Sequence, residues 1–304
     1  MAISRAQLVK ELEPGLNALF GLEYKRYDNQ HAEIYTNESS DRAFEEEVML
    51  SGFANANVKV EGSGVNYDQA QETYTARYTH DTIALAFAIT EEAIEDNLYD
   101  RISSRYTKAL ARSMSNAKQV KAAAPLNNGL PTADGFDSGD GVSLFNTSHT
   151  TVSGTSVKNT LTTQADLNET SLEQALIDIA AFTDERGLRV AAKGVKMIIP
   201  SANQFAAERL LKSQGRTGTA DNDINAVVSM GMVPQGYRVN NFLTDSDSWY
   251  IITDVPNGMK MFTRAPLTTA MEGDFDTGNV RYKARERYSF GVSDYRGIYG
   301  CEGA

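Results

Sequence analysis

The sequence predicts a mixed α+β fold organised around one long helix. Residues 90–124 contain no glycine or proline and are rich in the strong helix formers Ala, Leu, Glu, Lys and Arg. Residues 44–90 combine Val, Thr and Tyr with short glycine turns, which is typical of strands. Residues 166–268 alternate helix and strand signals, as a compact α/β unit does.

Composition narrows the class of protein. The 304 residues carry a net charge of −11, which argues against a general nucleic-acid binder because phosphate contacts need surplus Lys and Arg. The single cysteine, Cys301, excludes an intrachain disulfide framework. The N-terminal stretch lacks the apolar run of a signal peptide or a membrane span. We therefore expect synthesis in a reducing cytosol and no membrane partner.

Residues 1–43 are expected to form an N-terminal arm. It opens with a short amphipathic helix from about Ser4 to Leu12, which we expect to end at Pro14-Gly15. The polar stretch that follows carries aromatic residues spaced like anchors, namely Phe20, Tyr24, Tyr27 and Tyr35.

Residues 44–82 read as an extended β-hairpin loop. The segment VKVEGSGVNY, residues 58–67, predicts two short strands around a glycine turn. Few core-sized residues lie on either face, and a two-stranded ribbon is marginal alone, so we expect the hairpin to pack on another subunit. A solvated β-meander within one domain is the alternative. The candidate assembly contacts here are Lys59, Glu61, Gly62, Gly64 and Tyr67.

The strand at 82–90 leads directly into a spine helix at 91–124. All its acidic residues precede its basic ones, which suits the helix dipole at both ends. We expect the helix to stop before Pro125 and the Asn127-Asn128-Gly129 turn. Its large apolar residues step by four, so their stripe winds around the rod. Meanwhile Arg101, Arg105, Lys108 and Arg112 share one face.

After the spine, residues 126–169 form a long polar loop, which is usually functional or draped over a partner. Thr170 and Glu173 predict a capping box for the next helix, with Gly187 as its C′ residue. KGVKMIIPS predicts a buried strand, after which Ser201 would cap another helix. In the last strands, Arg281, Lys283, Arg285 and Arg287 alternate onto one face.

The usual catalytic motifs are absent from the sequence. His31, His80 and His149 are scattered, and none belongs to a zinc-protease pattern. No phosphate-binding loop, dinucleotide fingerprint or nucleophile elbow occurs. Residues 137–141 resemble a calcium loop, but the distal glutamate is missing, so we expect a turn. We predict no catalytic residue, cofactor or metal. The remaining candidates are two basic faces: Arg101, Arg105 and Arg112 on the spine helix, and Arg285 and Arg287 on the last strands. These side chains would be solvated or form salt links within the chain, or they would pair with neighbouring subunits or contact nucleic acid.

Taken together, the order of parts resembles a tailed-bacteriophage major capsid protein, and in particular the phage Mu-like head-subunit family. Four stretches carry the resemblance: FAITEEAIEDN (87–97), LNNGLPTADGFDSGDGVSLFNTSHT (126–150), LRVAAKGVKMIIPSANQFAAERLL (188–211) and RERYSFGVSDYRGIYG (285–300). It covers the chain from about residue 40 to its end. Some related capsids crosslink a hairpin lysine to an asparagine of a neighbour. Lys59 is the only lysine of the hairpin, and the sequence gives no warrant for that chemistry.

The resemblance implies the tailed-phage major capsid fold: an N-terminal arm (1–43), an extended loop (44–82), a peripheral domain (83–165 and 269–304) and an axial domain (166–268). It also implies a non-enzymatic subunit that assembles in the host cytoplasm, as pentamers and hexamers, into the icosahedral head of a virion. Implied partners are further copies of the chain, a portal, scaffold or decoration proteins, and packaged double-stranded DNA in non-specific proximity.

Two alternatives predict different observations. An encapsulin-like compartment would share the fold but enclose a cargo enzyme. A soluble α/β enzyme with an unusual β-arm would form a small oligomer and contain a deep pocket.

Overall fold

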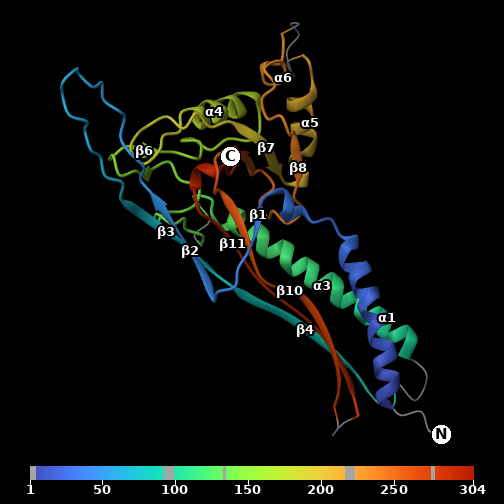
Figure 1. Cartoon of the computed structure of the whole chain (residues 1–304). Coiled ribbons are helices and arrows are strands. Elements are labelled where there is room, and N and C mark those ends of the chain that lie inside the picture. Colours follow the sequence, from blue (N-terminus) through green and yellow to red (C-terminus); the bar gives the residue numbers. More distant parts are fainter. Residues whose placement is uncertain (1–4, 91, 93–98, 133–134, 216–222, 275–277) are drawn as a thin grey trace.

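The computed structural model describes residues 5–90, 92, 99–132, 135–215, 223–274 and 278–304, with the backbone alone for 5–13 and 99–102. The chain forms an elongated layer of long strands and two helices, and a rounder α/β unit at one end of it (Figure 1). The fold is mixed α+β, as predicted. Several element boundaries differ from the predictions.

The long helix α3 spans Tyr99–Asn128. The predicted residues 91 and 93–98 lie outside the described part. The predicted stop before Pro125 is wrong, because the helix continues for another turn. Leu126 in that turn is fully buried, and its packing offsets the hydrogen bond that proline cannot make. The helix ends before Gly129, where a Cβ would lie 2.5 Å from the Pro125 carbonyl oxygen.

Helix α1 spans Arg5–Arg26, so the predicted stop at Pro14-Gly15 is also wrong. Leu16 and Phe20, which follow that pair, are buried against α3. This packing stabilises the second half of α1 against the cost of proline and glycine. The aromatic anchors of the arm thus lie on their own chain, since the Tyr35 hydroxyl also donates to the Ala122 carbonyl at 2.7 Å. The short 3₁₀ helix η1, Gln30–Glu33, lies between α1 and Tyr35 in the chain.

The long sheet has the strand order β1-β10-β11-β4. Strand β1 (Thr36–Ser39) pairs in parallel with β10 (Met259–Gly273), and β11 (Val280–Val292) pairs antiparallel with both β10 and β4 (Asp81–Ile89). Along β11, Tyr282 and Ala284 are buried in the cluster that α1 and α3 cover. The odd-numbered residues of β11 therefore form the opposite face of the sheet.

The hairpin consists of β2 (Phe44–Leu50) and β3 (Glu72–Thr79). Residues 51–71 between them contain no strand, so the two short strands predicted in 58–67 are wrong. Their side chains have nothing to bury against, since Val58 and Tyr67 are 94% and 98% exposed. The loop turns at Gly62, whose φ of 80° lies in the left-handed region that glycine favours.

The rounder unit is built on a second sheet, of order β12-β9-β7-β8. Its helices are α4 (Glu169–Ala180), α5 (Gln204–Lys212) and the short α6 (Ala226–Ser229). Its strands are β7 (Gly194–Ile199), β8 (Tyr237–Val239), β9 (Trp249–Thr253) and β12 (Ile298–Cys301). The loops around the unit contain four further short elements: β5 (His149–Thr150), β6 (Ser156–Val157), η2 (Ser201–Asn203) and η3 (Tyr295–Gly297).

Two predicted details of α4 are wrong. Its capping box is formed by Asn168 and Ser171, which exchange hydrogen bonds with each other's backbone, and Thr170 with Glu173 does not form it. Gly187 does not end the helix, which stops at Ala180. The predicted side-chain cap at Ser201 is also wrong, because Ser201 lies inside η2 and the N-cap residue of α5 is Asn203, which makes no side-chain cap hydrogen bond.

Candidate assembly surfaces

The root of the hairpin is fixed to the sheet by buried polar contacts. The Lys260 ammonium lies 2.5 Å from Glu47 of β2 and 3.1 Å from Glu38 of β1. Burial disfavours the charged ammonium, but the two carboxylates outweigh it and raise the pKa of Lys260. Tyr78 packs so closely that a Cβ at Gly291 would lie 2.6 Å from its ring. The root is therefore rigid, and it lies on the odd-numbered face of β11.

Beyond the root, residues 51–71 form a projecting loop, seen in blue at the upper left of Figure 1. A hydrogen bond from the Ser51 amide to the Gln71 carbonyl, 2.9 Å, closes its base. The five candidate contacts of the hairpin all lie on this loop and are exposed: Lys59, Glu61, Gly62, Gly64 and Tyr67. The sequence interpretation missed the exposed valines beside them, Val58, Val60 and Val65. Their signal was three valines in the largely polar stretch from 57 to 68.

The basic row on β11 lies on the same face as the hairpin root. Arg285 is exposed and Arg287 is partly covered. The register places Arg285 beside Ala84 of β4, and Lys283 beside Ala86. Arg281, at the far end, pairs with Asp274. The row is thus a string of long cationic side chains flanked by alanines.

The basic face of α3 lies on a different side of the molecule. Arg105, Lys108 and Arg112 are exposed, while the side chain of Arg101 lies outside the described residues. Lys118 and Lys121 mark the sheet side of α3, because they pair with Glu286 of β11 and Asp81 of β4. The structure therefore does not bring the two basic candidate sets together.

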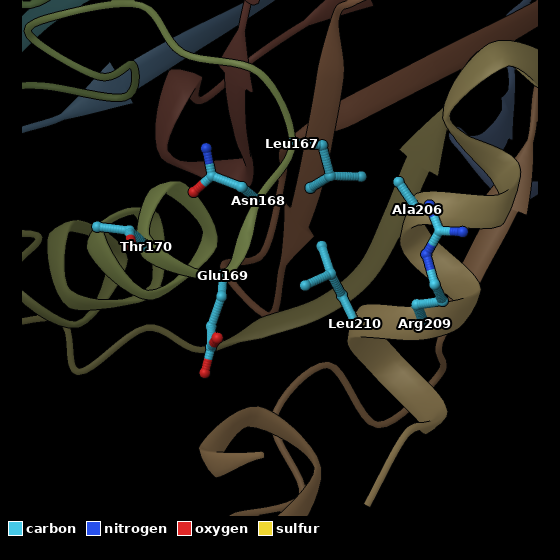
Figure 2. A pocket seen from close by; sticks show the side chains of 7 residues that line it. All are labelled: Leu167, Asn168, Glu169, Thr170, Ala206, Arg209 and Leu210. Carbon is cyan, nitrogen blue, oxygen red and sulfur yellow. The ribbon is translucent and has the colours of Figure 1, made fainter. Parts of the chain in front are cut away.

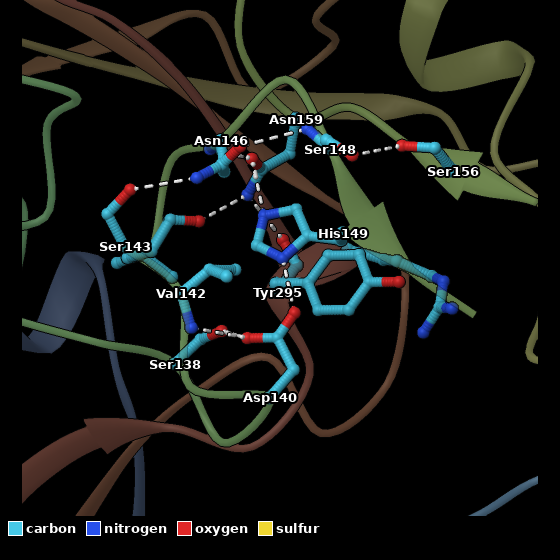
Figure 3. Close-up of polar contacts among 12 residues, drawn as sticks. Ser138, Asp140, Val142, Ser143, Asn146, Ser148, His149, Ser156, Asn159 and Tyr295 are labelled. Atoms are coloured by element: carbon cyan, nitrogen blue, oxygen red, sulfur yellow. Dashed lines mark hydrogen bonds and ion pairs between the residues drawn. The ribbon is translucent and has the colours of Figure 1, made fainter. Parts of the chain in front are cut away.

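A buried polar cluster fixes the long loop after α3 (Figure 3). The His149 ring is fully buried, with Nδ1 2.6 Å from Asp140 and Nε2 3.1 Å from the Asn159 side-chain oxygen. It stacks on Tyr295 at 3.9 Å between ring centroids. Burial opposes ionisation of Asp140, but hydrogen bonds from His149 and Ser138 outweigh it and lower the pKa of Asp140. The histidine is structural here, and residues 137–141 form the predicted turn.

One groove lies between α4 and α5 (Figure 2). Its volume is about 490 Å³. Among the described residues, no histidine, cysteine or lysine lines it, and Glu169 and Arg209 are the only charged ones. Within the described ranges, no three His, Cys, Asp or Glu side chains gather as a metal site would require. No helix in those ranges has the length and apolar character needed to cross a membrane.

Comparisons with known proteins agree with this architecture. No curated protein matches the chain. The chain is similar to the virus-like particle of Pyrococcus furiosus (12% identity, 95% of this chain and 98% of that one, TM-score 0.53). It is also similar to the capsid of Myoviridae phage XM1 (12%, 89% and 89%, 0.54) and to the procapsid of bacteriophage JBD30 (13%, 99% and 77%, 0.52). At these identities the likeness shows the fold.

The family comparison is more specific. The family model described as phage capsid protein matches residues 72–300, which is more than half of the chain. The narrower resemblance to phage Mu-like head subunits stays a prediction. The protein therefore belongs to the phage capsid protein family, and it is a major capsid protein with the tailed-phage capsid fold.

Proposed function

We propose that this subunit self-assembles, as pentamers and hexamers, into an icosahedral head shell that encloses the double-stranded DNA of a tailed phage. The observation that carries the proposal is the projecting loop at 51–71. It exposes Val58, Val60, Val65 and Tyr67 on a root fixed by the ion pairs of the buried Lys260 with two partly exposed carboxylates. Apolar side chains held away from their own core favour a partner surface. A closed shell of identical subunits supplies that surface on every copy.

The candidate contacts have a role in this proposal. Lys59, Glu61 and Tyr67 of the loop would contact a neighbouring subunit, with Gly62 and Gly64 shaping the turn. Arg285 and Arg287 would form ion pairs between subunits, because their face continues from the hairpin root and its alanines allow a close approach. Arg101, Arg105 and Arg112 belong to α3 and do not lie on this face.

The division into domains is also part of the proposal. We keep the arm (1–43), the extended loop (44–82), the peripheral parts (83–165 and 269–304) and the axial part (166–268) as functional units. Two strands connect these ranges. β10 begins at Met259 within the axial range and continues into the peripheral range, and β12 of the peripheral range pairs with β9 of the axial range. Those pairings would couple movements of the axial part to the peripheral sheet.

A structural, non-enzymatic role fits the family and the absence of the usual motifs from the sequence. We propose assembly in the host cytoplasm, with a portal and with scaffold or decoration proteins as partners. The content of purified particles tests the function against the encapsulin-like alternative. We expect nuclease-protected double-stranded DNA of phage origin inside particles from infected cells. Particles that hold a cargo enzyme and no DNA would contradict the proposal.

A further inference from the structure

The two basic faces of the subunit point in opposite directions. Lys118 and Lys121 of α3 reach the sheet through Glu286 and Asp81. At about 100° per residue, Arg105, Lys108 and Arg112 lie roughly 110–170° around the helix from the midpoint between those two lysines. Figure 1 shows α3 running alongside the long strands, so this α3 face is directed away from the sheet. The β11 row is on the sheet's other side.

The exposed cations of the α3 face lack acidic partners among the described residues, although the protein is acidic overall. Acidic residues outnumber basic ones by 40 to 29, so partners are plentiful. Lys118 and Lys121 each pair with one carboxylate, and Lys260 pairs with two. In contrast, the exposed cations of the α3 face form no ion pair with any residue that the structure describes: Arg105, Lys108 and Arg112.

The surroundings of this face favour a phosphate backbone over a protein surface. Ala109, Ser113 and Asn116 are exposed beside it and supply little apolar area. The exposed apolar residues of this part of α3 are Tyr106, which lies roughly 100–160° around the helix from the three cations, and Val120, which lies about 12 Å along the helix beyond Arg112. A stable protein interface usually has an apolar or aromatic core. The three cations extend over roughly 10 Å of helix. Measured along the axis of a duplex, that length corresponds to about three phosphates of one strand, at about 3.4 Å of rise each.

A groove beside the α3 face adds further cationic and amide side chains to this surface. The groove measures about 380 Å³ and lies between the end of α1 and α3. It includes Arg26, Arg112 and Asn116, and Asp28 is the one carboxylate among the described residues that line it. Arg26 is exposed and only loosely paired with Glu23, at 3.6 Å. Two guanidinium groups and several side-chain amides thus line a strip continuous with the α3 face.

We propose that the α3 face, Arg105, Lys108 and Arg112, lies on the inner surface of the shell and contacts the phosphates of packaged duplex DNA. This inference rests on the proposed function. Three exposed cations give weak, sequence-independent contact that salt weakens, which suits a container that must release its genome.

Lysine acetylation of intact particles tests the inference. DNA-filled and emptied shells are treated with a small acetylating reagent at low salt, and modification of each lysine is measured by mass spectrometry. Lys108 should lose most of its acetylation in filled shells. Lys283, the matched lysine on the opposite face, should be modified equally in both. Raising the salt to about 1 M, where the screening length is about 3 Å, should restore modification of Lys108 in filled shells.

Other outcomes overturn the inference without touching the function. Equal acetylation of Lys108 in filled and emptied shells would exclude contact with DNA. If Lys108 were protected in both, a second protein copy would cover the face. Protection that persists at high salt would exclude a phosphate contact. Failure of the proposed function would instead be seen as a lack of DNA-filled shells.

Discussion

At the residue scale, His31 connects the arm to α3. Its backbone amide donates to the Gln119 side-chain oxygen at 3.0 Å, which leaves the Gln119 amide nitrogen to donate to His31 Nδ1, also at 3.0 Å. Nδ1 must therefore be unprotonated. Burial, with the Lys118 ammonium nearby, lowers the pKa of His31 to about 4.

This lowered pKa predicts a pH-dependent stability of the subunit. Unfolded His31 binds a proton below about pH 6.5, while the folded ring resists protonation down to about pH 4, so stability falls as the pH drops through this window. The full pKa difference corresponds to a loss of at most about 3 kcal/mol in the free energy of unfolding near pH 4. The loss should be smaller than this limit because the ring is partly exposed to solvent. His31→Phe keeps the ring beside Phe290 but cannot be protonated.

Urea unfolding of the unassembled subunit at pH 7 and pH 5 measures the effect. The His31→Phe variant should lose less stability between these pH values than the natural chain. The same loss in both proteins would show that His31 does not carry the dependence.

How far the sequence predicts single residues depends on how local their partners are. The turn at 137–141 was predictable because its signals are adjacent residues. The cluster around His149 was not, because Asn159 holds its position through the carbonyl groups of Leu144 and Tyr295, which come from distant parts of the chain. The ion pairs of Lys260 with Glu38 and Glu47 could not be predicted either, because the partners are far apart in the sequence.

At the element scale, tertiary packing outweighs local stop signals. Pro14 and Pro125 were both expected to end helices, and both lie inside them. In each case the residues that follow are buried, Leu16 and Phe20 in α1 and Leu126 in α3. A proline inside a helix costs about 3 kcal/mol of stability, and burying one large apolar side chain contributes about 1.5–3 kcal/mol in return.

The core side of α3 predicts a severe effect for Leu110→Asp. Leu110 is 3% exposed, in the cluster with Phe20 and Met114. Lost packing alone costs about 2–5 kcal/mol, and an unpaired buried carboxylate adds to it. The variant should fail to fold, which soluble yield and thermal unfolding would show. Ala109→Asp, on the exposed side of the same turn, is the control and should fold. A folded Leu110→Asp subunit of normal stability would contradict this packing. Leu98, a second predicted core position, lies outside the described residues.

The projecting loop predicts the reverse behaviour. Deleting residues 58–67 removes only exposed residues, so the unfolding temperature of the subunit should change little. The variant should nevertheless fail to form shells. A length-preserving control, with Val58, Val60, Val65 and Tyr67 changed to serine, separates the reach of the loop from its apolar contacts. Electron microscopy and thermal unfolding measure both properties. A shortened variant that still builds normal shells would exclude the loop from assembly.

At the scale of the whole molecule, the order of the parts was more predictable than their edges. The spine helix, the hairpin and the α/β unit each carry a long local signal, which is why they were recognised. The return of the chain end into the second sheet was not, because the pairing of β12 with β9 joins residues far apart in the sequence. The opposite directions of the two basic faces also depend on how α3 packs on the sheet.

The central claim is that this subunit builds a closed shell, and electron microscopy of the purified full-length protein tests it most directly. The account predicts closed particles of uniform size with icosahedral symmetry. A preparation that contains only monomers and small oligomers would contradict it.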